Sequence, residues 1–450
     1  MLTDLSWLES NSAFPPVQEK IRLDEYRKND ILFNSQVPPE WSTDFKSIAR
    51  RLGKKQSEID TIFNYHQLIS KKTADFVCGE PPAIETEQDT DKITKKLENQ
   101  EFFTKLYEAF IDVSRFGNAV LKFRDKTVTA VSPMYWFPIC DKSDLKTISQ
   151  HVIAYPVNPN KDDIPQNLYV EIHEKGHFTE RLYSFNGNAT GGLIDEKTHI
   201  TGLDDFAVQI LTNVTSSSGL FGISDYSIIN SIVEKLIWRF SCIDNVLDKH
   251  SEPSMSGPAS AMDYDEETGL HFLNLGKYFA RSDKNSPDLR YITWDGNLES
   301  SFKETEILFN QLYILSEMGQ AFADAGGGDS SGTALKLRLV SPRVKAARLA
   351  KLNNSRVKNI ICTLCSINGI SIDYDSLTLH WNDGLPVDET EKIQTLALAV
   401  QNKIISQYSA MKRLGLSDSE VQAEIEQINE EQSAIQPLTL GVINNAENTT

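Results

Sequence analysis

The sequence predicts an α+β fold, and three observations along the chain support this prediction. Helical and then strand-like patterns fill the first half, two long helical patterns bracket a turn-rich stretch, and an acidic helical region follows. With 450 residues, 40% of them hydrophobic, the chain can bury a core, and its length suits about three domains or one elongated chain. A collagen, a disordered tail and a small disulfide scaffold are therefore excluded.

The first half predicts helices followed by a β-rich region. Apolar residues at helical spacing predict helices over 17–33, 57–76 and 102–116, and Ser57 is the expected N-cap of the second. Gly79-Glu80-Pro81-Pro82 should end that helix. β-branched and aromatic runs then predict strands over 119–123, 127–133, 151–157, 168–174, 177–185 and 206–214.

The second half predicts two rods and a basic helix. Steps of three and four between apolar residues predict long helices over 226–247 and 302–322, with a small module between them. A glycine cluster predicts a flexible loop, and a helical pattern over 333–365 follows, which Ser341-Pro342 should kink or break. A return strand over 370–381 and acidic helices over 388–430 complete the prediction, and the last residues are expected to fray.

Charge is distributed unevenly along the chain. There are 63 acidic and 45 basic side chains, and the formal net charge of -18 argues against a protein whose whole surface coats nucleic acid. Residues 330–372 nevertheless contain no Asp or Glu. They carry Lys336, Arg338, Arg343, Lys345, Arg348, Lys351, Arg356 and Lys358. From the pattern alone, these residues either pair with acidic neighbours in the same or another subunit or contact a polyanion.

His173-Glu174-Lys175-Gly176-His177 matches the H-E-x-x-H signature, so a zinc-dependent hydrolase is the alternative function. That mechanism needs both histidines on one helical face, with Glu174 activating a water molecule. The flanking residues alternate with period two, and Lys175-Gly176 is typical of a hairpin turn, so a β-hairpin is the preferred interpretation. Two other partial matches, to a phosphate loop and to a calcium loop, lack required residues. No metal or cofactor is expected.

Short motifs follow one another between about residues 20 and 430. They are Asn64 ahead of Ala74–Pro82, Gly117-Asn118-Ala119, Gly222–Asp225, Val246-Leu247-Asp248 with Pro253 and Gly257-Pro258, Tyr291–Gly296 with Leu298-Glu299, Ser331–Lys336, and Trp381 with Pro386–Glu389. In this order the motifs resemble the portal proteins of tailed bacteriophages, most closely those of phages with long non-contractile tails. The combination carries the resemblance, because no single motif is specific.

The resemblance implies a portal fold with a wing of helices and a β-rich part, a two-helix stem, a small α/β clip, a kinked tunnel helix and a helical crown. The implied parts are an N-terminal segment 1–29, the wing 30–222, the first stem helix 223–250, the clip 251–299, the second stem helix 300–322, the tunnel loop 323–334, the tunnel helix 335–368, the return strand to the wing 369–387, the crown 388–430 and a flexible tail 431–450.

The implied role is structural, without enzymatic activity. The resemblance implies a homo-oligomeric ring of about twelve subunits at the unique capsid vertex, through which double-stranded DNA is packaged and later ejected. The implied partners are the terminase large subunit, a head-completion or adaptor protein, and the major capsid and scaffolding proteins, with no membrane. The protein would be located in the virion after assembly in the cytoplasm of the bacterial host. An oligomeric scaffold without a DNA conduit is a further alternative.

The resemblance also implies roles for individual residues. The DNA-facing tunnel loop would comprise Gly326, Gly327, Gly328, Asp329, Ser330 and Ser331. The expected DNA-proximal cations are Lys336 and Arg338, and those expected at DNA or at a neighbouring subunit are Arg343, Lys345 and Arg348. The expected docking surface of the clip comprises Tyr264, Asp265, Glu266, Glu267, Tyr278 and Arg281. A glycine-rich loop and the early Pro342 depart from the family pattern, so the loop boundary stays open.

Overall fold

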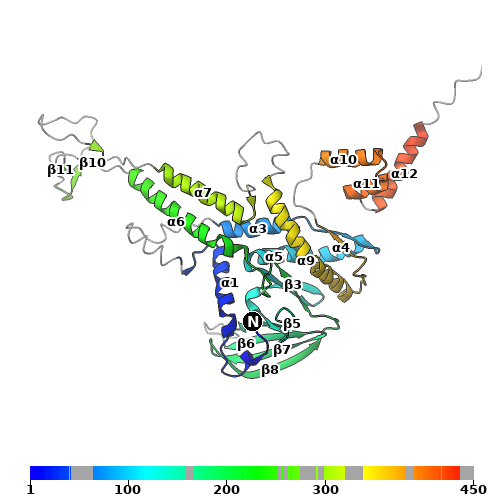
Figure 1. Ribbon diagram of the computed structural model, residues 1–450, viewed down its shortest axis with the longest axis horizontal. Helices are drawn as coiled ribbons and strands as arrows, with labels where there is room; N and C mark the ends of the chain where they lie inside the picture. Colours follow the sequence, from blue (N-terminus) through cyan, green and yellow to red (C-terminus); the bar gives the residue numbers. More distant parts are fainter. Residues whose placement is uncertain are drawn as a thin grey trace, which may run out of the picture.

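The structure is a computed structural model, and it describes residues 1–39, 41, 64–157, 166–217, 219–251, 255–256, 262–264, 266–273, 290–291, 298–319, 338–381, 389–416 and 418–435. Figure 1 shows a β-rich body with a layer of helices on one side. An arm of two long helices projects from this body, and a group of C-terminal helices lies apart from it (Figure 1).

Two antiparallel sheets form the body. The larger has the strand order β4-β5-β6-β7-β8, and the smaller has the order β3-β2-β9. The strands are β2 Asn118–Arg124, β3 Thr127–Val131, β4 Trp136–Cys140, β5 Ile148–Val157, β6 Asn167–Glu174, β7 His177–Phe185, β8 Thr190–Ile200 and β9 Val208–Thr212. Val120 and Val208 of the smaller sheet pack with Trp136 and Ile153 of the larger one, so the two sheets share a core.

The N-terminal residues pack on the five-stranded sheet. The ring of Phe137 on β4 lies 5.2 Å from Trp7 and 5.7 Å from Phe14, between ring centroids. Both N-terminal rings belong to a buried cluster with Val170 of β6. Residues 1–16, for which the sequence predicts no helix or strand, therefore contribute to the core. The short N-terminal helices are η1 Ser6–Leu8 and η2 Val17–Glu19, and α1 Lys20–Phe33 follows.

The helical layer consists of α3 Tyr65–Cys78, α4 Thr90–Asn99, α5 Phe102–Phe116 and α9 Val340–Ile367. α5 packs against both α3 and β2, and α9 packs against α3 and β9. Phe110 of α5 and Ile360 of α9 are completely buried in one cluster that spans these elements. α9 is therefore anchored in the core of the body although it lies far from α5 in the sequence.

Two glycines allow the end of α5 to touch the loop that precedes the arm. Gly117 ends α5 with a φ of +82°, and a Cβ atom there would lie 2.1 Å from the carbonyl oxygen of Gly222. A Cβ atom on Gly222 would lie 2.0 Å from the carbonyl oxygen of Gly117. Because side chains are excluded at both positions, this contact fixes where the arm leaves the body.

The arm consists of α6 Asp225–Ser251 and α7 Glu299–Leu315, which pack on each other (Figure 1). With 27 and 17 residues they are roughly 40 and 26 Å long at 1.5 Å per residue. Val233 and Ile237 of α6 pack with Leu312 of α7, and Glu304 accepts from Arg239 at 2.6 Å. The two predicted rods are confirmed.

The remaining elements are small or peripheral. Short antiparallel pairs lie between the two arm helices in the sequence: β10 Met255–Ser256 with β13 Arg290–Tyr291, and β11 Met262–Tyr264 with β12 His271–Leu273. β10 and β11 lie at the far end of the arm (Figure 1). The body adds η4 Pro133–Tyr135 and the pair β1 Ala83–Glu85 with β14 Thr378–His380. The C-terminal helices are α10 Glu389–Gln401, α11 Gln407–Leu414 and α12 Asp418–Ile435.

Several predicted boundaries are wrong. The second helix begins at Tyr65, where the Asn64 side chain accepts from the Gln67 N–H at 3.0 Å, and Ser57 lies outside the described residues. α7 ends at Leu315, before 322, because Glu317 and Gly319 adopt left-handed backbone conformations. Of the predicted strand 370–381, β14 pairs only over Thr378–His380. α12 reaches Ile435, past the predicted end of the acidic helices at 430. β4 and β8 were not predicted.

Pro342 does not kink the helix that contains it. The interruption predicted within 333–365 lies at Leu339, which is a turn residue and the N-cap of α9. Pro342 lies in the first turn of α9, where its missing N–H costs no intrahelical hydrogen bond. α9 then continues as one helix to Ile367.

Candidate functional site at the root of the arm

The basic residues of α9 do not form one exposed positive surface. Lys336 lies outside the described residues, and Lys345 is only 3% exposed. Arg356 Nη1 donates to Thr212 Oγ1 at 2.7 Å, and Lys358 Nζ lies 4.3 Å from the centre of the Tyr374 ring. Arg356 and Lys358 therefore hold α9 to the body through uncharged partners.

Lys345 and Asp225 form a buried ion pair that joins α9 to the first residue of α6. Lys345 Nζ lies 2.7 Å from Asp225 Oδ2 and also donates to the Ser316 carbonyl oxygen at 3.3 Å. The Asp225 carboxylate accepts three further hydrogen bonds from neutral donors on α3, α5 and the segment after β9. These donors are Thr73 Oγ1 at 3.5 Å, Ser114 Oγ at 2.7 Å and Asn213 Nδ2 at 3.0 Å.

The buried ion pair contradicts the role that the resemblance implies for Lys345. Lys345 was expected at DNA or at a neighbouring subunit, but its side chain is buried and its charge is neutralised by Asp225 in the same chain. A buried, paired ammonium group has no free charge for a phosphate. Lys345 instead connects α9 with the first residue of α6 and with Ser316 just after α7.

Arg348 lies one turn further along α9 and forms a second ion pair, with Glu317 just after α7. The side chains of both partners are roughly 40% exposed, so water screens this pair far more than the buried one. Arg343 is half-buried and Arg338 is partly exposed. Roles for Arg338, Arg343 and Arg348 at DNA or at another subunit stay predictions.

A cavity of about 420 Å³ lies over the two ion pairs. Its floor contains Asp225, Lys345 and Arg348, and aliphatic side chains surround it. The two acids and two bases in its lining form matched pairs, so the local charge is neutral on a chain whose net charge is -18. Its acids and amines are held in ion pairs, and the hydroxyls of Ser224 and Ser316 donate to backbone carbonyl oxygens.

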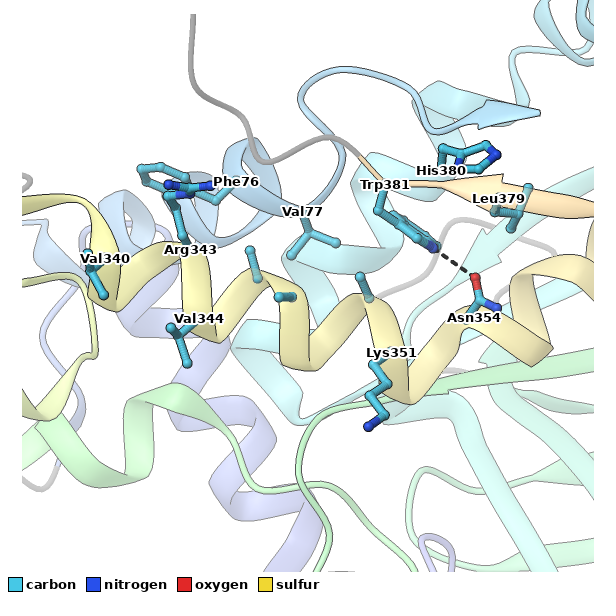
Figure 2. A pocket seen from close by; sticks show the side chains of 13 residues that line it. Phe76, Val77, Val340, Arg343, Val344, Lys351, Asn354, Leu379, His380 and Trp381 are labelled. Atoms are coloured by element: carbon cyan, nitrogen blue, oxygen red, sulfur yellow. Dashed lines mark hydrogen bonds between the residues drawn. The ribbon is translucent and has the colours of Figure 1, made fainter. Parts of the chain in front are cut away.

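A larger cavity, of about 770 Å³, lies along α9 between α3 and β14 (Figure 2). Phe76, Val77 and Leu379 provide an apolar wall, and Trp381 Nε1 donates to Asn354 Oδ1 at 2.9 Å (Figure 2). His380 also lines the cavity and its Nε2 lies 2.7 Å from a carboxylate oxygen of Glu85. Most of the lining is apolar, and the side chains of Trp381 and His380 are held by Asn354 and Glu85, so the described lining offers no catalytic constellation.

The H-E-x-x-H segment forms a hairpin, as preferred from the sequence. Glu174 pairs with His177 and His173 with Phe178 across β6 and β7. Because successive side chains of a strand alternate between faces, His173 and His177 project from opposite sides of the sheet. Two imidazoles so arranged do not bind one zinc ion, so the zinc hydrolase alternative is wrong. Among the described residues, no group of three His, Cys, Asp or Glu side chains could hold a metal ion.

His173 belongs to a buried network between the two sheets. Its Nε2 lies 3.0 Å from Glu171 Oε2, and Lys122 Nζ on β2 donates to both Glu171 oxygens at 2.8 Å. Burial raises the pKa of Glu171, but the hydrogen bonds and charges of His173 and Lys122 outweigh it and lower the pKa to about 2. Burial lowers the pKa of the neighbouring His151 to about 3. The motif therefore serves the packing of the two sheets.

The remaining predicted site residues belong to the predicted tunnel loop and to the predicted surface of the clip. Gly326, Gly327, Gly328, Asp329, Ser330 and Ser331 of the predicted tunnel loop lie outside the described residues, as do Asp265, Tyr278 and Arg281 of the predicted clip surface. Tyr264 is 57% exposed, and Glu266 and Glu267 are exposed. In the described part of the chain, no helix is long and apolar enough to cross a membrane.

Sequence reasoning missed the central residues at the root of the arm. The sequence marks Asp225 only as part of the Gly222–Asp225 motif, and no pattern distinguishes Glu317. One signal was available for Asp225, since an acid at the first position of a long helix is stabilised by the helix dipole. No local pattern connects either acid with Lys345 or Arg348, because the partners are far apart in the sequence.

The sequence matches one protein family model, and the fold is similar to several solved structures. Residues 21–438 match the model of a family described as "Phage portal protein, SPP1 Gp6-like". A similar solved structure is the neck of a native gene transfer agent particle computed with C12 symmetry, at 12% identity and a TM-score of 0.46, covering 83% of this chain and 94% of that chain. Another is the virion of a native gene transfer agent particle, at 11% identity and a TM-score of 0.42, covering 78% and 89%. A comparison with curated proteins finds no match.

Proposed function

The chain belongs to the SPP1 Gp6-like phage portal family, and from this premise we propose that it forms the ring of about twelve subunits at one vertex of a phage capsid. It is a structural protein and not an enzyme. In the proposed role, double-stranded DNA enters the capsid through the ring during packaging and leaves through it during ejection. A separate terminase would supply the energy.

The arm is the observation that carries this proposal. α6 and α7 pack on each other, project from the body and hold short strands at their far end, which suits a stem and a clip (Figure 1). Phe302 and Ile307 on α7 are 51% and 54% exposed. In a ring, arms that stand side by side would bury such residues against their neighbours.

The proposed contacts within the virion follow from this arrangement. Exposed Tyr264, Glu266 and Glu267 lie near the tip of the arm, where the terminase large subunit and later the head-completion protein would dock. The proposed tunnel loop at 323–334 would face DNA, with Lys336 and Arg338 beside it. The major capsid and scaffolding proteins are proposed to surround the ring, and assembly is proposed to occur in the bacterial cytoplasm.

Electron microscopy of the purified chain tests the ring. We expect closed rings of about twelve subunits in negative stain. Monomers and open, irregular oligomers under all conditions, including heads assembled with the capsid proteins, would contradict the proposal.

A packaging assay tests the DNA contacts separately. The double variant Lys336→Glu with Arg338→Glu is expected to lower the amount of DNA packaged per head while rings still form. Arg124→Glu is the matched control, because Arg124 is 63% exposed at the β2–β3 turn of the wing. Normal packaging by the double variant would refute the assignment of these two cations and leave the ring proposal standing.

A further inference from the structure

Five aliphatic side chains surround the 420 Å³ cavity at the root of the arm. They come from the segment around β9 and α6 and from the end of α7: Val214 at 38% exposed, Ile223 at 46%, Ile228 at 49%, Ile314 at 65% and Leu315 at 40%. We call this set the apolar rim. A partner that covered these side chains would remove their apolar surface from water, which favours association.

The apolar surface continues beyond the rim in two directions. Ile307, 54% exposed, lies seven residues before Ile314 and on the same side of α7. A neighbouring cavity shares Glu317 and Lys345 with the first one and adds Val340 and Val344 of α9, which are 47% and 58% exposed. The exposed aliphatic surface therefore runs from the arm across its root to the first turns of α9.

The polar floor of the cavity favours a docking surface over a ligand site. Asp225 already accepts hydrogen bonds from four donors, and Lys345 Nζ is held by Asp225 and Ser316. A small charged ligand would have to displace these bonds. Within the described residues, Arg348 Nε is buried and has no acceptor. The occupant is therefore expected to bring mainly aliphatic surface.

Charge decides which macromolecule fits. The lining of the cavity contains two acids and two bases in matched pairs, so it offers DNA no net positive charge. Two copies of a chain with a net charge of -18 repel each other over most of their surfaces. A locally neutral, apolar patch is the part of such a surface that another copy can approach without this repulsion.

We propose that the apolar rim packs against the next copy of this chain and that this contact seals the Asp225–Lys345 ion pair from water. The inference rests on the proposed ring and adds the location of a subunit contact within it. The contact is heterologous, so the rim of each copy meets a different surface of its neighbour, and repetition of this contact closes the ring. Water exclusion strengthens the ion pair, so ring closure also holds α9 more firmly to the root of the arm.

The double variant Ile228→Glu with Ile314→Glu tests the contact in the full-length chain. The two residues are 49% and 65% exposed in the single copy, so the variant should fold, with circular dichroism like that of the wild type. Buried in the proposed interface, two unpaired carboxylates should reduce the fraction of chain in rings at least about tenfold, measured by mass photometry at equal protein concentration. Ile200→Glu is the matched control, because Ile200 is 88% exposed on β8 and lies outside the rim.

The outcomes separate this inference from the proposed function. Wild-type rings together with normal rings of the double variant would overturn the inference and leave the function intact. If the wild type forms no rings even in assembled heads, the proposed function itself fails.

A second measurement does not depend on how the charged variant folds. Ile314→Cys, labelled with a polarity-sensitive fluorophore, should show a blue-shifted emission on ring assembly, and the same label at Ile200→Cys should not. Equal emission from the Ile314→Cys label in single copies and in rings would also overturn the inference.

Discussion

Removal of the charge on Lys345 should destabilise the folded chain much more than removal of the charge on Arg348. Both residues lie on α9 and both pair with an acid at the root of the arm. They differ in burial, since the side chains of Lys345 and Asp225 are 3% and 11% exposed, whereas those of Arg348 and Glu317 are 38% and 43% exposed. The comparison of Lys345→Met with Arg348→Met therefore isolates the effect of burial on an ion pair.

The expected magnitudes follow from the contacts that each substitution leaves. Loss of one partner from a buried ion pair costs about 3–5 kcal/mol, because the other charge stays in the protein without compensation. Lys345→Met should lie near 3 kcal/mol in this range, since Asp225 keeps its three neutral donors. Asp225→Ala should lie near 5 kcal/mol, because Lys345 then keeps only the Ser316 carbonyl oxygen. Arg348→Met should cost less than about 1 kcal/mol.

Thermal unfolding of the variants in one oligomeric state measures this order. At about 2 °C per kcal/mol for a large domain, Lys345→Met should lower the Tm by about 6 °C and Asp225→Ala by about 10 °C. The variant that combines Lys345→Met with Asp225→Ala should lose less stability than the sum of the two single losses, because the two residues interact directly. A loss for Lys345→Met equal to or smaller than that for Arg348→Met would refute the reasoning.

Two further predictions concern the body. Because the pKa of Glu171 falls from its ordinary 4.5 to about 2 on folding, its ionised form should stabilise the fold by about 3 kcal/mol above about pH 4.5. This contribution should disappear as the pH falls from 4.5 towards 2. In urea unfolding across this range, the wild type should lose about 3 kcal/mol more stability than Glu171→Gln, because only the wild type carries this carboxylate. Gly117→Ala should destabilise the chain by more than about 3 kcal/mol, because its Cβ would lie 2.1 Å from the Gly222 carbonyl oxygen. Gly192→Ala is the control, since nothing lies within 4 Å of a Cβ there, and equal unfolding midpoints for both glycine variants would contradict the steric argument.

The sequence predicts best the elements whose burial is periodic. α6 buries Ile229, Val233 and Leu236 at steps of three and four, and its helical pattern is therefore visible in the sequence. β8 has no such pattern, because every residue from 192 to 200 is exposed and Gly191-Gly192 resembles a loop. β8 exists because it pairs along the edge of β7, and such a pairing is a tertiary interaction.

The candidate site illustrates the same limit. Local composition identifies the basic segment of α9, but it does not distinguish a cation that faces solvent from one that is buried against a distant acid. Lys345 and Asp225 are separated by 120 residues, and Arg356 and Thr212 by 144. The resemblance to portal proteins supplied the order of the elements, whereas the individual partners of these cations come only from the three-dimensional packing.

The use of these cations within the chain bears on how a ring would treat DNA. Lys345, Arg348, Arg356 and Lys358 are engaged with groups of their own chain. At a net charge of -18 per copy, a ring of about twelve would carry roughly -200, and only a few positive charges per subunit would remain for the channel. Since the affinity of proteins for DNA grows with the number of phosphates that they neutralise, such a channel would hold DNA weakly. Weak, sequence-independent contact suits a conduit through which DNA has to slide in both directions.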